Sequence, residues 1–256
     1  MTGPAAVARD WPSLGVVVPV YNEARSIAHS CLEILGVVHR YPGRAMVIAV
    51  DDGSRDDSAA VLAKLGEEHE QLCLVQHSAN TGYGHALRTG AERARALGFE
   101  YVAFMDSDLT NPPADLLKIG ELARQGRLYI KASRFVRGGS MGAVPFTRRL
   151  LSRAANIFAA ALFGTSVRDV TNGFRGGRTD LICSLPTRDH TFAVIVEEFG
   201  LALAAGIEPV EFPTSLSARS GDQRRSAFSY SPSLLWAYLR YALRGCVRRI
   251  QRSHRR

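Results

Sequence analysis

The sequence predicts an α/β protein with a mostly parallel central sheet covered by helices. In the first half of the chain, short β-branched apolar segments alternate with longer amphipathic ones, which is typical of alternating strands and helices. Each apolar segment also runs into a polar or glycine-containing turn. With 256 residues, of which 46% are hydrophobic, the chain can build one sizeable core. We therefore expect a single domain over residues 1–231, followed by a basic tail over residues 232–256.

The elements of the first half alternate regularly. We expect strands at Gly15–Val20, Ala45–Asp51, Leu72–Gln76 and Tyr101–Met105, and helices at Glu23–His39, Asp56–His69, Gly82–Leu97 and Ala114–Arg124. Two helix starts support this order: the segment from Ser54 to Asp57 resembles a capping box with Asp in place of Glu, and Pro112-Pro113 suits a first helical turn. Ligands of open α/β sheets bind at the carboxyl ends of the strands. The turn residues that we expect to gather at this edge are Asn22, Asp52, Asn80 and Asp106.

The second half is less regular. We expect a strand at Tyr129–Ser133, a helix at Arg148–Phe163, a short apolar segment at Thr171–Arg175, a helix at Phe192–Ala205, a strand at Pro209–Pro213 and a loop at Thr214–Tyr230. The tail Pro232–Arg256 is predicted to be a helix with apolar side chains at three-and-four spacing and arginines between them. Two interpretations of this helix are open: its apolar face packs on the protein's own core, or it lies in a membrane interface with its arginines on anionic lipid.

Composition limits the location and the partners of the chain. The formal net charge of +8 favours an anionic partner, such as nucleic acid, acidic lipid or a phosphorylated substrate. The four cysteines are far apart and form no C-x-x-C pair, so we expect neither a disulfide framework nor structural zinc, and a reducing cytoplasm. No signal-peptide pattern is present, and no apolar run approaches the roughly 20 residues that span a bilayer. We expect a protein that is not itself transmembrane.

A pair of carboxylates follows the fourth predicted strand. Asp106 and Asp108, separated by Ser107, come directly after the strand that ends at Met105. In extended chain the first and third side chains point the same way, so both carboxylates can approach one hard cation that diphosphate oxygens also hold. Such an ion neutralises a leaving nucleotide diphosphate. A D-x-D triplet alone is common by chance, however, and a strand-end Asp often only caps a helix.

Two other strand ends carry candidate contacts to a nucleoside. Asp51 and Asp52 end the second strand, where an acidic side chain can accept hydrogen bonds from a base or a ribose. The neighbouring Ser54 suits a turn and a helix N-cap. After the first strand, Tyr21 has a ring that can pack on a base, and Glu23 has a carboxylate that can bond to it.

The segment Gly82-Tyr83-Gly84 partly resembles a dinucleotide-binding loop. It lacks the third glycine at the required spacing, and no acidic residue follows where the ribose contact would be expected. We interpret it as a closely packed helix start, with Asn80 and His85 as minor ligands of the donor.

Four segments occur in the order and spacing of a known family: VVVPVYNEARSI, VIAVDDGSRDDS, ANTGYGHALRTGAERA and YVAFMDSDLTNPP. With them, the sequence resembles the family-2 glycosyltransferases, and within these the branch of polyprenol-phosphate (dolichol-phosphate) mannosyl- and glucosyltransferases. The resemblance continues through KASRFVRGG, RRLLSRAANIF, DVTNGFRG and EPVEFPTSLSARSGDQRRS, and so covers roughly Leu14 to Arg225. It implies the GT-A fold, a Rossmann-like nucleotide-diphospho-sugar transferase domain.

The resemblance also implies roles for individual residues. Those implied to hold the nucleoside are Pro19, Tyr21, Glu23, Val50 and Asp52. Those implied to bind Mg²⁺ or Mn²⁺ and the diphosphate are Asp106 and Asp108, with Ser107 between them. Those implied to face the reacting phosphate of a lipid acceptor are Arg134, Arg148 and Ser152. Those implied to close over the donor diphosphate are Arg219 and Arg225.

The activity that the resemblance implies is inverting transfer of a hexose from a GDP- or UDP-sugar to a polyprenyl monophosphate. It also implies a peripheral protein at the cytoplasmic face of a membrane, with no nucleic-acid partner. An acceptor phosphate is already ionised near neutral pH, so no general base is required.

Two alternatives stay open. The first is transfer to a hydroxyl acceptor, a polysaccharide or a small phosphorylated acid, which requires a base such as Glu197 or Glu198. The second is a non-enzymatic basic protein that binds a membrane or nucleic acid. The sequence also departs from the branch: Thr110 stands where Gln or Ser is common, Arg225 stands where Lys is frequent, and the transmembrane segments of many relatives are absent. Membrane contact is then expected from the basic tail or from a partner.

Overall fold

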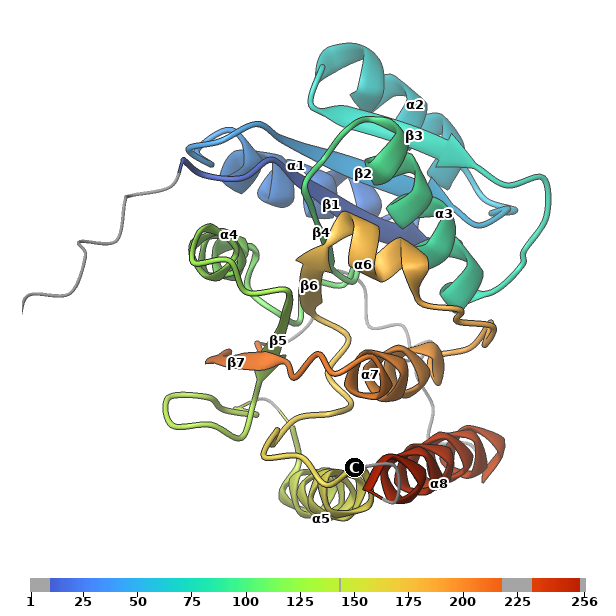
Figure 1. The fold of residues 1–256 in the computed structure, drawn as a ribbon. Coiled ribbons are helices and arrows are strands. Elements are labelled where there is room, and N and C mark those ends of the chain that lie inside the picture. Colours follow the sequence, from blue (N-terminus) through green and yellow to red (C-terminus); the bar gives the residue numbers. More distant parts are fainter. Residues whose placement is uncertain (1–9, 143, 218–231, 254–256) are drawn as a thin grey trace, which may run out of the picture.

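A computed structural model describes residues 10–142, 144–217 and 232–253 of the chain. Its central sheet has seven strands in the order β3-β2-β1-β4-β6-β5-β7 (Figure 1). The strands are β1 (Leu14–Val20), β2 (Ala45–Asp51), β3 (Leu72–Gln76), β4 (Tyr101–Phe104), β5 (Tyr129–Ser133), β6 (Arg175–Arg178) and β7 (Val210–Pro213). Neighbouring strands run parallel except in the two pairs that involve β6. The predicted mostly parallel sheet is confirmed.

Helices cover both faces of this sheet. They are α1 (Ile27–Val38), α2 (Ser58–Glu68), α3 (Tyr83–Ala96), α4 (Leu116–Arg124), α5 (Phe146–Phe163), α6 (Thr179–Ser184), α7 (Val194–Ala204) and α8 (Pro232–Ser253), with a short 3-10 helix, η1 (Pro113–Asp115). Along β1, Val16 and Val18 pack with side chains of α1, α2 and α4, whereas Val17 packs with side chains of α3, α6 and α7. The alternation of side chains along a strand thus divides the core into two layers.

The β6 and α6 elements were not resolved by sequence patterning, which predicts only a short apolar segment ending at Arg175. Glycine fills the middle of β6, so the strand lacks the β-branched signal. A Cβ at Gly176 would lie 2.9 Å from the Ile119 side chain and 3.0 Å from the Val102 carbonyl oxygen. The strand therefore needs glycine for close packing, and this same requirement hides it from a pattern search.

The predicted capping box at Ser54 and the predicted helix start at Glu23 are wrong. The N-cap of α2 is Asp57, without a capping side-chain hydrogen bond, and α1 begins at Ile27. Ser54 Oγ instead accepts the backbone N–H of Asn22 at 2.9 Å, in a contact between two separate turns. The Ser54 hydroxyl thus makes a tertiary hydrogen bond and does not cap the helix. The start of η1 at Pro113 does confirm the predicted Pro-initiated turn.

The tail helix α8 lies beside α5 and against α7 (Figure 1). On this inner side Leu234, Tyr241 and Ala242 are buried in the core that α7 also builds. Packing on the protein's own core therefore holds for one face of α8, while Trp236 and Leu243 on its other side are exposed. Across the residues that are described, no helix combines the length and the apolar character needed to cross a bilayer.

Candidate functional site

The turns that follow β1, β2 and β3 meet at the carboxyl edge of the sheet, as predicted. The turn after β1 is joined to the turn after β2 because Asn22 N–H donates to Ser54 Oγ. The turn after β2 is joined to the segment after β3, where Thr81 N–H donates to the Asp52 carboxylate at 2.9 Å. Asn22 adopts a left-handed conformation, with φ of 56°, which asparagine tolerates better than most residues. These contacts build one continuous polar edge.

The residues that the resemblance assigns to a nucleoside lie along this edge in different environments. Tyr21 is exposed, and Pro19 is partly exposed at the end of β1. Glu23 is half-buried, and its carboxylate accepts the Ser26 hydroxyl at 2.9 Å. Val50 is completely buried in the core, so only its main chain is near the edge. The roles of these four nucleoside candidates remain predictions.

Asp52 organises the loop after β3. Its carboxylate accepts the Thr81 hydroxyl at 2.7 Å and the Gly82 N–H at 2.7 Å, and it lies 2.8 Å from His77 Nδ1. Burial alone would raise the pKa of Asp52, but the hydrogen bonds from Thr81, His77 and the backbone N–H groups outweigh it and lower the pKa below its ordinary value. The carboxylate assigned to the nucleoside by resemblance is thus already held by the chain's own donors.

The neighbouring Asp51 differs from Asp52. Its Oδ1 accepts the Ser54 N–H at 3.3 Å, whereas its buried Oδ2 has no hydrogen-bond partner within the described part of the chain. A buried acceptor without a partner is costly and marks a place where a ligand can supply the missing donor. Of the two adjacent acids, Asp51 is thus the one with a buried acceptor atom that lacks a partner within the described part of the chain.

The D-x-D carboxylates follow β4 and are both oriented by hydroxyl donors. The Tyr83 hydroxyl donates to Asp106 Oδ1 at 2.9 Å. The Thr110 hydroxyl and N–H donate to Asp108 Oδ1 at 3.0 and 3.1 Å, so Thr110 orients this carboxylate. Leu109, which lies between Asp108 and Thr110, adopts φ of 52°, a strained conformation for a non-glycine residue. Hydrogen bonds to both carboxylates and the left-handed backbone at Leu109 thus define the conformation of this turn.

This turn fits a divalent cation. Asp106, Ser107 and Asp108 present oxygen atoms, the ligands that Mg²⁺ and Mn²⁺ prefer, and all three residues are partly exposed. Among the described residues, no group of three or more His, Cys, Asp or Glu side chains could hold a metal ion alone. A two-carboxylate site of this kind is suited to an ion that shares its remaining positions with phosphate oxygens and water.

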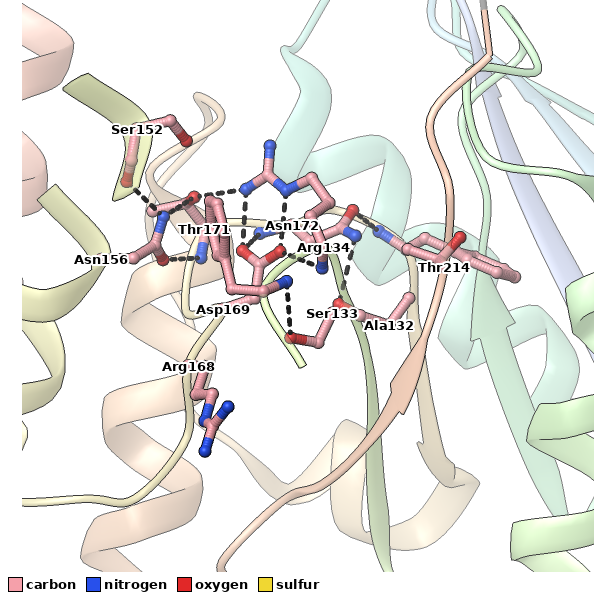
Figure 2. A network of polar contacts seen from close by, with 12 residues as sticks. Ala132, Ser133, Arg134, Ser152, Asn156, Arg168, Asp169, Thr171, Asn172 and Thr214 are labelled. Carbon is pink, nitrogen blue, oxygen red and sulfur yellow. Dashed lines mark hydrogen bonds and ion pairs between the residues drawn. The ribbon is translucent and has the colours of Figure 1, made fainter. Parts of the chain in front are cut away.

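A second polar network lies between β5 and α5 (Figure 2). Arg134 donates from Nε and Nη2 to the buried Asp169 carboxylate, at 2.7 Å each, and from Nη2 to the Thr171 hydroxyl at 2.9 Å. Asn156 also donates to the Thr171 hydroxyl, at 3.0 Å, and to the Ser152 carbonyl oxygen at 2.9 Å. The network therefore joins Arg134 to the main-chain carbonyl of Ser152, on the turn of α5 that carries this second candidate for the acceptor phosphate. Reasoning from the sequence found their segments by resemblance but not Asp169 as the partner that fixes the guanidinium.

Arg148 and Ser152 lie one turn apart on α5 but in different environments. Ser152 is buried beside the network, whereas Arg148 is exposed near the start of the helix. Their common role at a phosphate remains a prediction. Arg219 and Arg225 lie outside the described residues, and so does most of the predicted loop Thr214–Tyr230.

The two candidate general bases have structural roles. Glu198 forms a buried bidentate pair with Arg175, with both N to O distances at 2.7 Å, and it accepts the Tyr129 hydroxyl at 2.8 Å. Glu197 accepts the Arg188 backbone N–H at 2.9 Å. The pair is buried, and Arg175 lies opposite Phe104, the last residue of β4, two positions before Asp106. The sequence gives no signal for it, because β6 itself carries no recognisable strand pattern.

A buried lysine lies in the same interior. Lys131 on β5 is completely buried, and its Nζ donates to the Asn172 carbonyl oxygen at 3.0 Å. Burial, with the nearby charge of Arg175, lowers the pKa of Lys131 to about 7. Lys131 therefore titrates near neutral pH.

The chain is similar to known proteins in both sequence and fold. The family model described as Glycosyl transferase family 2 matches residues 15–184. A polyprenol monophosphomannose synthase of Mycolicibacterium smegmatis is 24% identical over 236 residues, which cover 90% of this chain and 87% of the relative. An undecaprenyl-phosphate 4-deoxy-4-formamido-L-arabinose transferase of Pseudomonas aeruginosa is 31% identical over 179 residues, which cover 66% of this chain and 48% of the relative. The chain thus spans about half the length of that second relative.

Among solved structures, glucosyl-3-phosphoglycerate synthase from Mycobacterium tuberculosis in complex with uridine diphosphate superposes with a TM-score of 0.68. The match covers 92% of this chain and 80% of the other at 18% identity. The same enzyme in complex with Mn²⁺, UDP-glucose and phosphoglyceric acid gives a TM-score of 0.65 at 20% identity. Identity at this level shows a shared fold alone, and it confirms the GT-A fold.

Proposed function

The chain belongs to glycosyl transferase family 2, and we propose that it transfers a hexose from a GDP- or UDP-sugar to a polyprenyl monophosphate, with inversion at the anomeric carbon. The names of the two relatives, a polyprenol monophosphomannose synthase and an undecaprenyl-phosphate arabinose-type transferase, support a polyprenyl phosphate acceptor. The observation that carries the proposal is the polar edge itself. Along it, the unpartnered Asp51 oxygen lies at the end of β2, and the two carboxylates that suit a cation, Asp106 and Asp108, follow β4 on the other side of β1.

Each part of the edge has a distinct task in this reaction. Asp51 Oδ2 accepts a hydrogen bond from the base or ribose, and the exposed Tyr21 ring packs against the nucleoside. Asp106 and Asp108 hold the cation, which when bound neutralises the charge of the leaving diphosphate. Rate enhancement then comes from positioning and electrostatic stabilisation in a preorganised site.

The acceptor side of the site supports a phosphate rather than a hydroxyl. A phosphate monoester is ionised near neutral pH and needs no base to attack. The two carboxylates suggested as bases for a hydroxyl acceptor are occupied, Glu198 by a buried arginine and Glu197 by a backbone N–H. Arg134 instead offers a guanidinium fixed by Asp169 beside Ser152, and arginine forks suit phosphate oxygens.

The exposed surface of α5 and α8 supports work at a membrane. Of the ten large hydrophobic side chains that are exposed in the described parts of the chain, five lie on α5 and two on α8. They are Phe146, Leu150, Leu151, Ile157, Phe158, Trp236 and Leu243. A concentration of exposed apolar side chains on two adjacent helices marks an interaction surface.

The charges on these helices support a membrane as the partner of this surface. α5 contains three arginines and α8 contains five, and neither helix contains an acidic residue. Helices that combine arginines with Trp, Phe and Leu lie in the interface of bilayers that contain anionic lipid. We therefore assign membrane contact to the α5–α8 surface, in place of the tail alone. Ser152 lies on the inner side of α5, so a lipid phosphate held at the bilayer surface is brought next to the Arg134 network.

Membrane contact can be tested on folded protein. Leu150→Ser combined with Phe158→Ser should release the chain from vesicles that contain phosphatidylglycerol, with donor binding unchanged. Leu32→Ser combined with Leu128→Ser is the matched control, since these leucines are also exposed but lie elsewhere. Equal vesicle binding by both double variants would exclude this surface.

The reaction itself is tested in two steps. A thermal-shift screen of GDP, UDP and their hexoses with Mn²⁺ identifies the donor, because a ligand at about 100 times its Kd stabilises the fold by about 2.7 kcal/mol. Transfer of labelled hexose is then measured to undecaprenyl phosphate and to phosphoglyceric acid. Transfer to the lipid is the expected result, whereas transfer only to phosphoglyceric acid would establish the hydroxyl alternative.

A further inference from the structure

Tyr83 lies at the first residue of α3 with its ring and its hydroxyl both engaged. The ring stacks on Phe192, with centroids 4.2 Å apart and an interplanar angle of 28°. The hydroxyl donates to Asp106 Oδ1 at 2.9 Å. A phenol hydroxyl is protonated at neutral pH and acts as a donor toward an ionised carboxylate. The contact therefore fixes one oxygen of the first D-x-D acid.

The second oxygen of Asp106 lies against a glycine. A Cβ built at Gly173 would be 3.3 Å from Asp106 Oδ2 and also 3.3 Å from the Tyr83 hydroxyl oxygen. This separation is shorter than most Cβ contacts, so even a methyl group would press on both atoms. Glycine at this position leaves the tyrosine and the carboxylate the space to bond.

The start of α3 is itself held in place by the segment before α7. Gly84 N–H donates to the His190 carbonyl oxygen at 3.0 Å, and Arg88 donates to the Asp189 carbonyl oxygen at 3.1 Å. A Cβ at Gly84 would lie 2.1 Å from the Asp189 carbonyl oxygen, so the two backbones approach as closely as glycine allows. The Gly82-Tyr83-Gly84 segment is thus the closely packed helix start predicted from the sequence. Its rigidity gives the Tyr83 hydroxyl a fixed position.

We propose that Tyr83 is a positioning residue that holds the Asp106 carboxylate in the orientation that receives the divalent cation. The proposal rests on the metal role given to Asp106 under the proposed function. Hydrogen bonds from outside the coordination sphere orient ligating carboxylates, and their loss weakens metal binding although every ligand remains. A carboxylate without such a donor must also lose rotational freedom when the ion binds.

Mn²⁺ titration of the full chain tests the proposal without relying on turnover. The free Mn²⁺ signal in electron paramagnetic resonance is followed with GDP or UDP present, for the parent chain and Tyr83→Phe. The phenylalanine keeps the ring on Phe192 and removes only the hydroxyl. We expect the Kd for Mn²⁺ to rise by roughly 10- to 100-fold.

Tyr41→Phe is the matched control. It also removes one buried tyrosine hydrogen bond, to the Pro12 carbonyl oxygen at 2.8 Å, but at the amino end of the sheet. Tyr41→Phe should lower the melting temperature by a similar amount and leave the Kd for Mn²⁺ unchanged. Gly173→Ala should also raise the Kd for Mn²⁺, because its methyl group would press on the Tyr83 hydroxyl and on Asp106 Oδ2.

The outcomes distinguish the positioning role of Tyr83 from the metal role of Asp106. Equal Mn²⁺ affinity in the parent and in Tyr83→Phe would overturn the positioning role and leave the proposed function intact. The same weakening in Tyr41→Phe would also overturn it, because the effect would then be one of general stability. A parent chain that takes up no Mn²⁺ with either nucleotide would refute the metal role and the positioning role together.

Discussion

Replacing Asp51 with asparagine should weaken donor binding without weakening the fold. Asp51 is completely buried, and its Oδ2 has no partner in the described part of the chain. Asparagine has nearly the same shape, and its amide oxygen can keep the hydrogen bond from Ser54 N–H. The substitution therefore changes mainly the charge and the acceptor that the ligand uses.

The expected magnitudes follow from that geometry. An unpaired buried polar group costs about 1–3 kcal/mol, and more when it is charged, so loss of the Asp51 charge should leave the free energy of unfolding unchanged or raise it. In the complex the same change removes a hydrogen bond to a charged acceptor, which is worth about 1.5–3 kcal/mol. The Kd for the donor nucleotide should rise between roughly tenfold and more than a hundredfold.

Asp52→Asn is the control and should behave in the opposite way. Its carboxylate is held by Thr81, Gly82 and His77, so the variant should unfold at a lower temperature. Because the folded-state pKa of Asp52 is lowered, its stabilisation is present above the ordinary carboxyl pKa and is lost as the pH falls below it. Thermal melts and calorimetric titration with GDP and UDP measure both quantities. Donor binding at the parent level in Asp51→Asn would refute the assignment of this oxygen to the nucleoside.

Four other substitutions test the remaining parts of the site and the interior. Asp108→Asn should abolish transfer with an unchanged circular dichroism spectrum, because an amide cannot supply the charge that holds the cation, and parent turnover in metal-free buffer would contradict this. Ser152→Ala and Arg148→Ala should each slow transfer roughly tenfold to more than a hundredfold with the Kd for the donor unchanged, since a charged phosphate contact is lost. Lys131→Met should raise the melting temperature at pH 7. Burial lowers the pKa of Lys131 to about 7, so between pH 7 and the ordinary lysine pKa the unfolded parent binds more protons than the folded parent. The stability of the parent therefore rises with pH over this range. Thermal melts of the variant should lack this rise.

The carboxyl edge could be predicted from sequence because its signals are local. The apolar pattern of a strand is visible in the sequence, and the residue that follows this pattern lies at the end of the strand. Parallel strands then bring Asn22, Asp52 and Asp106 to one edge without any knowledge of side-chain contacts. Strand patterning alone did not choose between Asp51 and Asp52, because adjacent residues share the same edge, and the resemblance implied Asp52. In the structure the two carboxylates differ in their hydrogen bonds, since the loop after β3 donates to Asp52.

The partners of the site residues could not be predicted because they come from distant segments. Arg134 is fixed by Asp169, which is 35 positions away, and no pattern near either residue indicates the other. The capping prediction at Ser54 failed for the same reason, since its hydroxyl bonds to a turn 32 positions earlier. Polar side chains have several possible partners at the level of sequence, and the fold selects one of them.

The packing of α8 decides how its function can be tested. Tyr241 on α8 donates to Asp189 Oδ2 at 3.0 Å, and the Asp189 carbonyl oxygen in turn accepts from Arg88 on α3. Phe192, three residues along, supports the Tyr83 ring that bonds to Asp106. Deleting the tail from Pro232 onward would remove the exposed Trp236 and, with it, the inner side chains that support this segment. A loss of membrane binding after deletion would therefore not separate lipid contact from damage to the metal turn, whereas Trp236→Ser changes only the exposed face of the helix.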